Sequence, residues 1–251
     1  MRVLSTCLIA WVIWVITGQS VSAQIVPIQS IGCIKANCAD DEIVGACGVV
    51  IAMFNNAADP SKSCVYMESK DRSSGIRFCG LMLNLGIEYG FAGKIETDPI
   101  TGERQLTYEP APMCGIATEM PKPLYMPNCR VGGGDFAFNA SAHRGQPGVH
   151  GGSGLNNVGL LIKTSGKVMA TNSSLSYFYI DDGSRCNDGS GYLGIRVSYR
   201  YFPAGPLGLL PKRGDWVSVT GVSCMMKIAS KLRPIIECRG SEDFEFISFA
   251  Q

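Results

Sequence analysis

The chain has 251 residues, 46% of them hydrophobic, so it is long enough to bury one large core or two small ones. Its 30 glycines and 13 prolines, set among short alternating runs, favour an all-β fold with many turns over a helical one. With 22 basic and 21 acidic side chains the formal net charge is +1, which excludes a global field that attracts anionic polymers or membranes. A local charged patch is still allowed.

Residues 1–23 are predicted to be a secretory signal peptide. Arg2 precedes a largely apolar stretch at 3–17, and the sequence VSA at 21–23 supplies the small residues of a cleavage site. A membrane-spanning helix needs roughly twenty apolar residues, and this run is shorter. We therefore expect cleavage after Ala23, no stable membrane span afterwards, and a secreted or extracytoplasmic protein in the periplasm or at the cell surface. A retained anchor is the alternative.

Export changes how the eleven cysteines are interpreted. Cys7 lies in the signal peptide, and the even number that remains predicts disulfides in an exported protein. Zinc is the rival explanation, but the chain has no CxxC pair and only two histidines, His143 and His150. The pairing pattern cannot be deduced from sequence alone. Because seven of these cysteines precede the segment 130–157 and three follow it, complete pairing requires a bridge between the two halves.

The first half, 24–129, shows a pattern that the second half, 158–251, repeats. Expected strands in the first half cover 48–54, 64–69, 75–78, 85–95 and 103–109. The Gly-rich segment 130–157 has no sustained period and is interpreted as a linker or a loop laid over the surface. Expected strands in the second half cover 159–170, 177–181, 194–202, 214–223 and 232–240. Five short strands, repeated, predict two small closed barrels in tandem joined by the linker.

Four stretches carry a resemblance to a known group: YMESKDRSSGIRF at 66–78, GGGDFAF at 132–138, QPGVHGGSGLNNVGLL at 146–161 and YFYIDDGS at 177–184. The chain resembles tandem oligonucleotide/oligosaccharide-binding (OB) folds and, more narrowly, a group of exported bacterial OB-like proteins of unassigned function. The resemblance covers nearly all of the mature chain, which differs from the group in its many cysteines. Related OB domains occur beside exported nucleases, which implies a nucleic-acid context.

In an OB barrel the second and third strands and the loops around them commonly form the binding face. Alternation along the strands of the second half directs the aliphatic residues inward and four others to one outer surface: Tyr177, Tyr179, Arg196 and Arg200. Aromatic rings beside guanidinium groups suit base stacking and phosphate neutralisation. The alternative is that these side chains only cover the sheet and pair across strands.

The first half offers Tyr66 and Arg77 at the matching positions, but Glu68 beside them weakens a positive field. From residue 158 onward there are eleven basic and eight acidic side chains, against ten and thirteen in 24–157. The second half is therefore the better candidate for an anionic ligand.

The turn after 177–181 also carries oxygen-bearing side chains that suit calcium: Asp181, Asp182, Ser184, Asn187 and Asp188. Cys186 stands where an oxygen ligand is wanted and no glutamate closes the set, so we expect a strand-connecting turn and no metal.

Catalysis has less support, because both histidines lie in the Gly-rich segment and no nucleophile elbow is present. We expect a non-catalytic binding module without a cofactor, with single-stranded nucleic acid or an oligosaccharide as ligand. The alternative is a disulfide-braced cell-envelope structural or protein-interaction module whose partner is an envelope protein.

Overall fold

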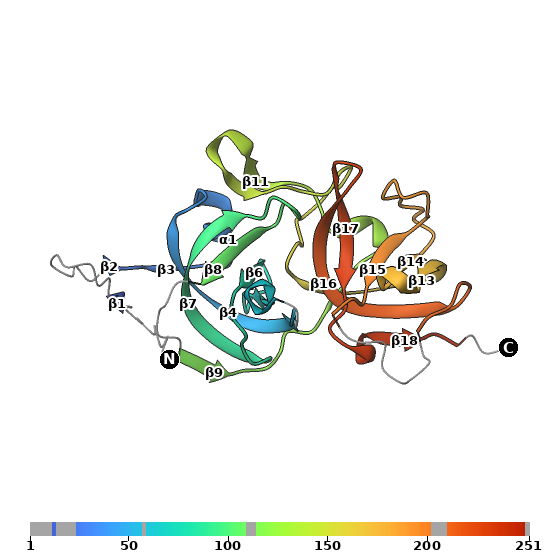
Figure 1. The fold of residues 1–251 in the computed structure, drawn as a ribbon, viewed down its shortest axis with the longest axis horizontal. Helices are drawn as coiled ribbons and strands as arrows, with labels where there is room; N and C mark the ends of the chain where they lie inside the picture. The colour runs from blue at the N-terminus through green and yellow to red at the C-terminus, as the bar shows by residue number, and fades with distance from the viewer. Residues whose placement is uncertain (1–11, 14–23, 57–58, 109–113, 202–209, 249–251) are drawn as a thin grey trace, which may run out of the picture.

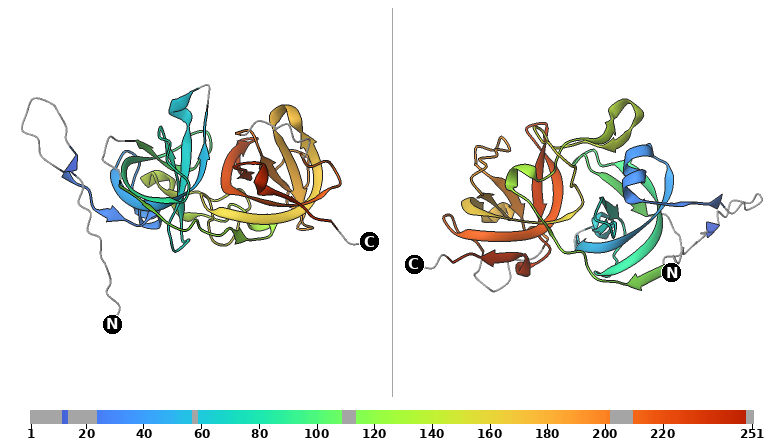
Figure 2. Two further views of the ribbon diagram at one scale, coloured as in Figure 1. Left: turned by 90° about the horizontal axis from the view of Figure 1, so that it is seen from below. Right: turned by 180° about the vertical axis from the view of Figure 1, so that it is seen from behind.

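The structure, a computed structural model, describes residues 12–13, 24–56, 59–108, 114–201 and 210–248. Most of the predicted signal peptide, 1–23, lies outside these ranges; β1 (Val12–Ile13) is described and pairs with β2 (Gln24–Ile25). Two β-rich lobes lie side by side, each built on a seven-stranded sheet (Figures 1 and 2). In the described part of the chain no helix is long and apolar enough to cross a membrane.

The first lobe contains a closed five-stranded barrel. Its strands are β4 (Ile43–Phe54), β5 (Cys64–Glu68), β6 (Gly75–Cys79), β7 (Ile87–Thr97) and β8 (Arg104–Tyr108). They pair in the order β4-β5-β6-β8-β7, and β7 returns to β4; β6 and β8 are parallel and the other pairs antiparallel. This closed barrel confirms the expected all-β, OB-like fold. Three short elements and a 3₁₀ turn complete the lobe: β3 (Ile28–Gln29), α1 (Ile31–Asn37), η1 (Pro60–Lys62) and β9 (Cys114–Ala117).

The second lobe has the same strand order. Its central strands are β13 (Leu161–Asn172), β14 (Tyr177–Asp181), β15 (Ile195–Ser198), β16 (Trp216–Ile228) and β17 (Lys231–Glu237). They pair as β13-β14-β15-β17-β16, with β16 also on β13 and with β15 parallel to β17. The lobe also holds β10 (Leu124–Tyr125), η4 (Ser173–Leu175), η5 (Ser241–Asp243) and β18 (Phe244–Phe246).

Period-two alternation decides which side chains fill each lobe. Val65 and Met67 of β5 enter the core of the first lobe, while Tyr66 between them packs elsewhere. Phe178 and Ile180 of β14 enter the core of the second lobe in the same way. Each long first strand, β4 and β13, also contains a register shift where its pairing passes from one neighbour to the other, which lets the strand bend around the barrel.

The Gly-rich segment 130–157 is packed onto the protein. It follows η2 (Asn128–Arg130) and contains β11 (Phe136–Asn139), η3 (Ala140–Ala142) and β12 (Arg144–Gln146). The β11–β12 hairpin contacts α1, and Figure 1 shows it beside the first lobe. Gln146 is fully buried; its Oε1 accepts from the Arg104 backbone N at 2.8 Å and its Nε2 donates to the Gly102 carbonyl at 3.2 Å. The segment is therefore anchored to the first lobe through Gln146 and contains short elements of its own.

A disulfide joins Cys64 and Cys79, which lie opposite each other on β5 and β6. Six other cysteines are free thiols: Cys33, Cys38, Cys129, Cys186, Cys224 and Cys238. The predicted disulfide formation is therefore confirmed for Cys64 and Cys79, while these six cysteines are not bridged. Cys38, Cys224 and Cys238 are each buried in a different apolar cluster, which keeps their sulfur atoms apart.

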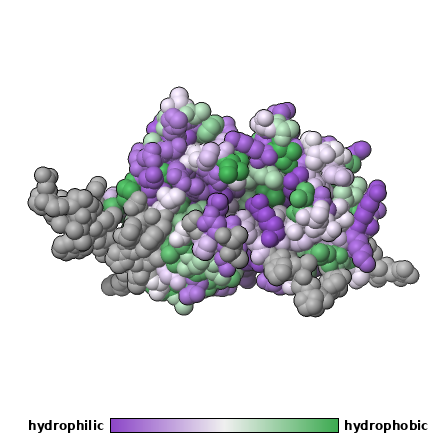
Figure 3. Space-filling view, in the orientation of Figure 1, coloured by the Kyte–Doolittle hydropathy of each residue, from purple (hydrophilic) through white to green (hydrophobic). Residues whose placement is uncertain are grey.

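The lobes are joined by an apolar cluster with members from both: Ile51, Ala52, Phe54, Tyr66, Leu161, Val222, Cys224 and Ile235. Buried Lys35 adds a polar clamp, because its Nζ donates to the carbonyls of Gly75 at 2.9 Å and Val158 at 3.0 Å. Gly75 and Gly159 approach so closely that a Cβ on Gly75 would lie 2.1 Å from the Gly159 oxygen. Figure 3 shows polar and apolar residues interspersed over one face of the molecule, in line with its balanced charge.

Candidate ligand-binding surface

Three of the predicted site residues, Tyr177, Tyr179 and Arg196, come together on the outer face of β14 and β15. Tyr179 and Arg196 lie opposite each other across the strands, and the rings of Tyr177 and Tyr179 meet edge to face with centroids 5.8 Å apart. The Arg196 guanidinium lies 4.4 Å from the Tyr177 centroid and 5.3 Å from the Tyr179 centroid. An aromatic pair and a cation are thus in contact, as base stacking beside a phosphate requires.

The loop that follows β14 folds back over part of this cluster. Tyr179 is 0% exposed, and its hydroxyl donates to Asp188 Oδ2 at 2.6 Å while accepting from Arg196 Nε at 2.8 Å. Burial and the hydrogen bond to Asp188 raise the pKa of Tyr179 to about 12. The Tyr192 ring, 47% exposed, lies 5.3 Å from the ring of Tyr179. The accessible surface therefore consists of half-buried Tyr177, Tyr192 and one edge of Arg196, whose side chain is 12% exposed.

The carboxylates at the start of this loop shape the turn. Asp181 Oδ1 accepts from the Arg185 backbone N at 2.9 Å, and Asp182 accepts from the backbone N of Ser184 at 2.9 Å and of Asn128 at 2.8 Å. Burial alone would raise the pKa of Asp182, but the hydrogen bonds from Ser184 and Asn128 outweigh it and hold that pKa below its ordinary value. Within the described ranges, no three His, Cys, Asp or Glu side chains are grouped to hold a metal ion.

Arg200 lies past the end of β15, at the junction of the lobes. Its Nη2 is 2.6 Å from Glu237 Oε1 and its guanidinium is 4.8 Å from the Tyr201 ring centroid. Together with Tyr66 and Arg77 it lines a cavity of about 30 Å³, which holds little more than one water molecule. Arg200, whose side chain is 50% exposed, therefore lies at this junction, whereas Tyr177, Tyr179 and Arg196 contact one another.

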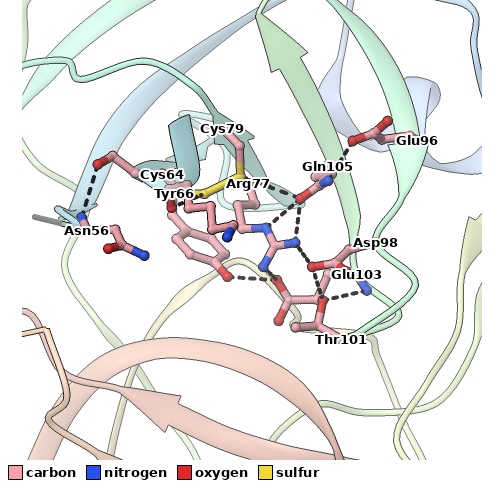
Figure 4. Close-up of a disulfide and its surroundings, with 12 residues drawn as sticks. Asn56, Cys64, Tyr66, Arg77, Cys79, Glu96, Asp98, Thr101, Glu103 and Gln105 are labelled. Atoms are coloured by element: carbon pink, nitrogen blue, oxygen red, sulfur yellow. Dashed lines mark hydrogen bonds and ion pairs between the residues drawn. A yellow bond between two sulfur atoms is a disulfide. The ribbon is translucent and has the colours of Figure 1, made fainter. Parts of the chain in front are cut away.

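Tyr66 and Arg77 lie opposite each other on β5 and β6, at the same barrel position as the Tyr–Arg pair of the second lobe. Tyr66 is 4% exposed and donates to Glu103 Oε2 at 2.7 Å, while Arg77 forms an ion pair with Asp98 (Figure 4). Burial raises the pKa of Tyr66 well above its ordinary value. Because Tyr66 belongs to the apolar cluster shared by both lobes, the second lobe covers this part of the face.

Sequence reasoning missed the roles of Tyr192 and Glu103, and assigned Asp188 only to a rejected calcium set. Tyr192 stands in a Gly-rich loop where no periodicity indicates its direction. Glu103 accepts hydrogen bonds from Tyr66 and from the Met225 backbone, contacts that depend on how the lobes dock. The Asp-Gly-rich composition of the loop was the available signal for Asp188.

No protein-family model and no curated protein matches the chain. Among solved structures, the chain is similar to the crystal structure of fission yeast Pot1 with single-stranded DNA. The identity is 11%, the match covers 88% of each chain, and the TM-score is 0.37.

Proposed function

We propose that the protein is an exported, non-catalytic binding module with two OB domains in tandem, and that the second lobe binds single-stranded nucleic acid. The observation that carries the proposal is the stack of Arg196 on Tyr177 at 4.4 Å, on the strands that OB domains use for binding. Tyr192 extends the aromatic surface beyond the strands. Stacking contributes about 1–3 kcal/mol per base and tolerates many sequences.

Export is part of the proposal. A disulfide between Cys64 and Cys79 belongs in an oxidising compartment, and the N-terminal sequence has the features of a signal peptide. The first lobe then serves as a docked support, because its own Tyr–Arg pair is turned toward the second lobe.

A second candidate function, a rigid protein-interaction module of the cell envelope, is favoured by one observation. The burial of Tyr66 and Tyr179 removes two of the predicted aromatic residues from a ligand's reach. An oligosaccharide ligand would use the exposed rings without needing the cation.

The test is fluorescence anisotropy of labelled oligo-dT with the oxidised chain from residue 24 onward, at low and physiological salt. Tyr177→Ala and Arg196→Gln are compared with Tyr125→Ala and Arg213→Gln, which change exposed residues of the same chain. We expect binding that weakens with salt, because phosphate contacts release counterions, and that falls in the first two variants only. Absence of binding at low salt would refute the nucleic-acid proposal and favour the interaction module.

A further inference from the structure

A cavity of about 340 Å³ lies beside the loop that covers Tyr179. Four segments far apart in sequence form it: 128–131, 149–152, 186–195 and 233–234. Part of its wall is apolar, from Val131, Val149 and Pro234. A cavity of this size holds a small organic molecule, whereas the cavity between the lobes does not.

The polar part of the wall includes the cationic side chain of Arg233. Arg233 Nε is buried without a hydrogen-bond partner, and Arg233 Nη1 has only a 3.4 Å contact with the Asn187 carbonyl. Among the described residues, neither Arg233 nor nearby Lys231 forms an ion pair. His150 lies on the same wall, and the charge of Lys231, slight burial and the charge of Arg233 together lower its pKa.

The one carboxylate in this lining, Asp188, is already engaged. Its Oδ2 accepts from the Tyr179 hydroxyl and lies 3.7 Å from Arg196 Nη2, and its Oδ1 accepts from the Ser190 backbone N at 2.8 Å. Asp188 therefore neutralises Arg196 and leaves Arg233 uncompensated. It also connects the cavity to the aromatic cluster, because it lines the first and is bonded to the second.

We infer that the cavity binds one nucleotide unit, with its phosphate against Arg233 and its base against Val131, Val149 and Pro234. This inference rests on the proposed function and deepens it: a strand that stacks on Tyr177 and Arg196 places a neighbouring nucleotide, or its phosphorylated end, in the cavity. Inorganic phosphate would fill only a small part of the volume and leave the apolar wall wet. A neutral sugar would leave the guanidinium unpaired.

The test is calorimetric titration of the oxidised chain from residue 24 onward with dTMP, thymidine and inorganic phosphate, using wild type, Arg233→Gln and the control Arg213→Gln. We expect dTMP to bind at least about tenfold more tightly than either fragment, and Arg233→Gln alone to weaken it by about tenfold or more, since hydrogen bonds to charged groups are the strong ones. Absence of dTMP binding, equal binding of phosphate, or an unaffected Arg233→Gln variant would overturn the inference.

A second measurement does not depend on the folding of Arg233→Gln. Exposed Cys129 and half-buried Cys186 both line the cavity, so in a Cys186→Ser protein alkylation of Cys129 with a bulky maleimide should block dTMP. The Cys129→Ser/Cys186→Ser protein, treated in the same way, should keep full dTMP binding; loss in both proteins or in neither would contradict the inference. If oligo-dT binds through Tyr177 and Arg196 while dTMP does not bind, the proposed function stands and this inference fails. If dTMP binds while oligo-dT does not, this inference stands and the proposed function fails.

Discussion

Removing the carboxylate of Glu103 should loosen the junction between the lobes. Glu103 is 1% exposed, and it accepts from the Tyr66 hydroxyl at 2.7 Å and from the Met225 backbone N at 2.6 Å. In Glu103→Ala both buried donors lose their acceptor, at about 1–3 kcal/mol each, so we expect the free energy of unfolding to fall by about 4 kcal/mol. For a chain of this size that corresponds to a fall in Tm of roughly 10 °C.

The assay is urea unfolding followed by tyrosine fluorescence, with hydrogen exchange at the Met225 amide as a local readout. Glu103→Gln keeps one acceptor oxygen and should lose about half as much stability. Glu119→Ala, at an exposed position, is the matched control and should change little. A loss below about 1 kcal/mol in Glu103→Ala with unchanged protection of Met225 would refute the reasoning, because both donors would then have found other partners.

Three further outcomes concern buried Lys35 and the cysteines. Burial lowers the pKa of Lys35 to about 7 from 10.5, so between these values the unfolded chain holds the extra proton. Wild-type stability should therefore rise with pH across this window relative to Lys35→Met, by up to about 1.4 kcal/mol per pH unit; a constant difference in urea midpoints would contradict this. Maleimide labelling should modify exposed Cys129 first and Cys186 more slowly, since burial raises the pKa of Cys186. Buried Cys224 and Cys238 should react only on unfolding, and mass spectrometry of labelled peptides checks the order. Replacing Cys64 and Cys79, 15 residues apart, with serine should lower the free energy of unfolding by about 3 kcal/mol, and equal Tm values for the two proteins would count against a stabilising bridge.

Alternation predicted the strands well, because each side of a barrel strand faces either the core or the outside. It placed Phe178 and Ile180 inside and Tyr177 and Arg196 outside, as the structure has them. Past the end of β15 at Ser198 the alternation continues, with Tyr199 in the core and Arg200 half exposed at the junction of the lobes.

The alternation along a strand could not predict which outward-facing side chains are buried by other parts of the chain. Tyr66 and Tyr179 both alternate to the outer side of their strands. The second lobe nevertheless buries Tyr66, and the loop after β14 buries Tyr179. Both contacts join residues that no short-range period relates. The pairing of the cysteines stayed open for a similar reason, because an even count says nothing of the distances between sulfur atoms.

The close approach of Gly75 and Gly159 has a consequence for stoichiometry. With no side chain between these backbones and Lys35 bonded on both sides, the lobes have no room to rotate and expose the Tyr66 face. A nucleic-acid strand would then occupy a single barrel, whose footprint is about 4–16 nucleotides. Affinity should reach a plateau once the oligonucleotide spans that length, and a longer strand should gain no bivalent advantage from the first lobe.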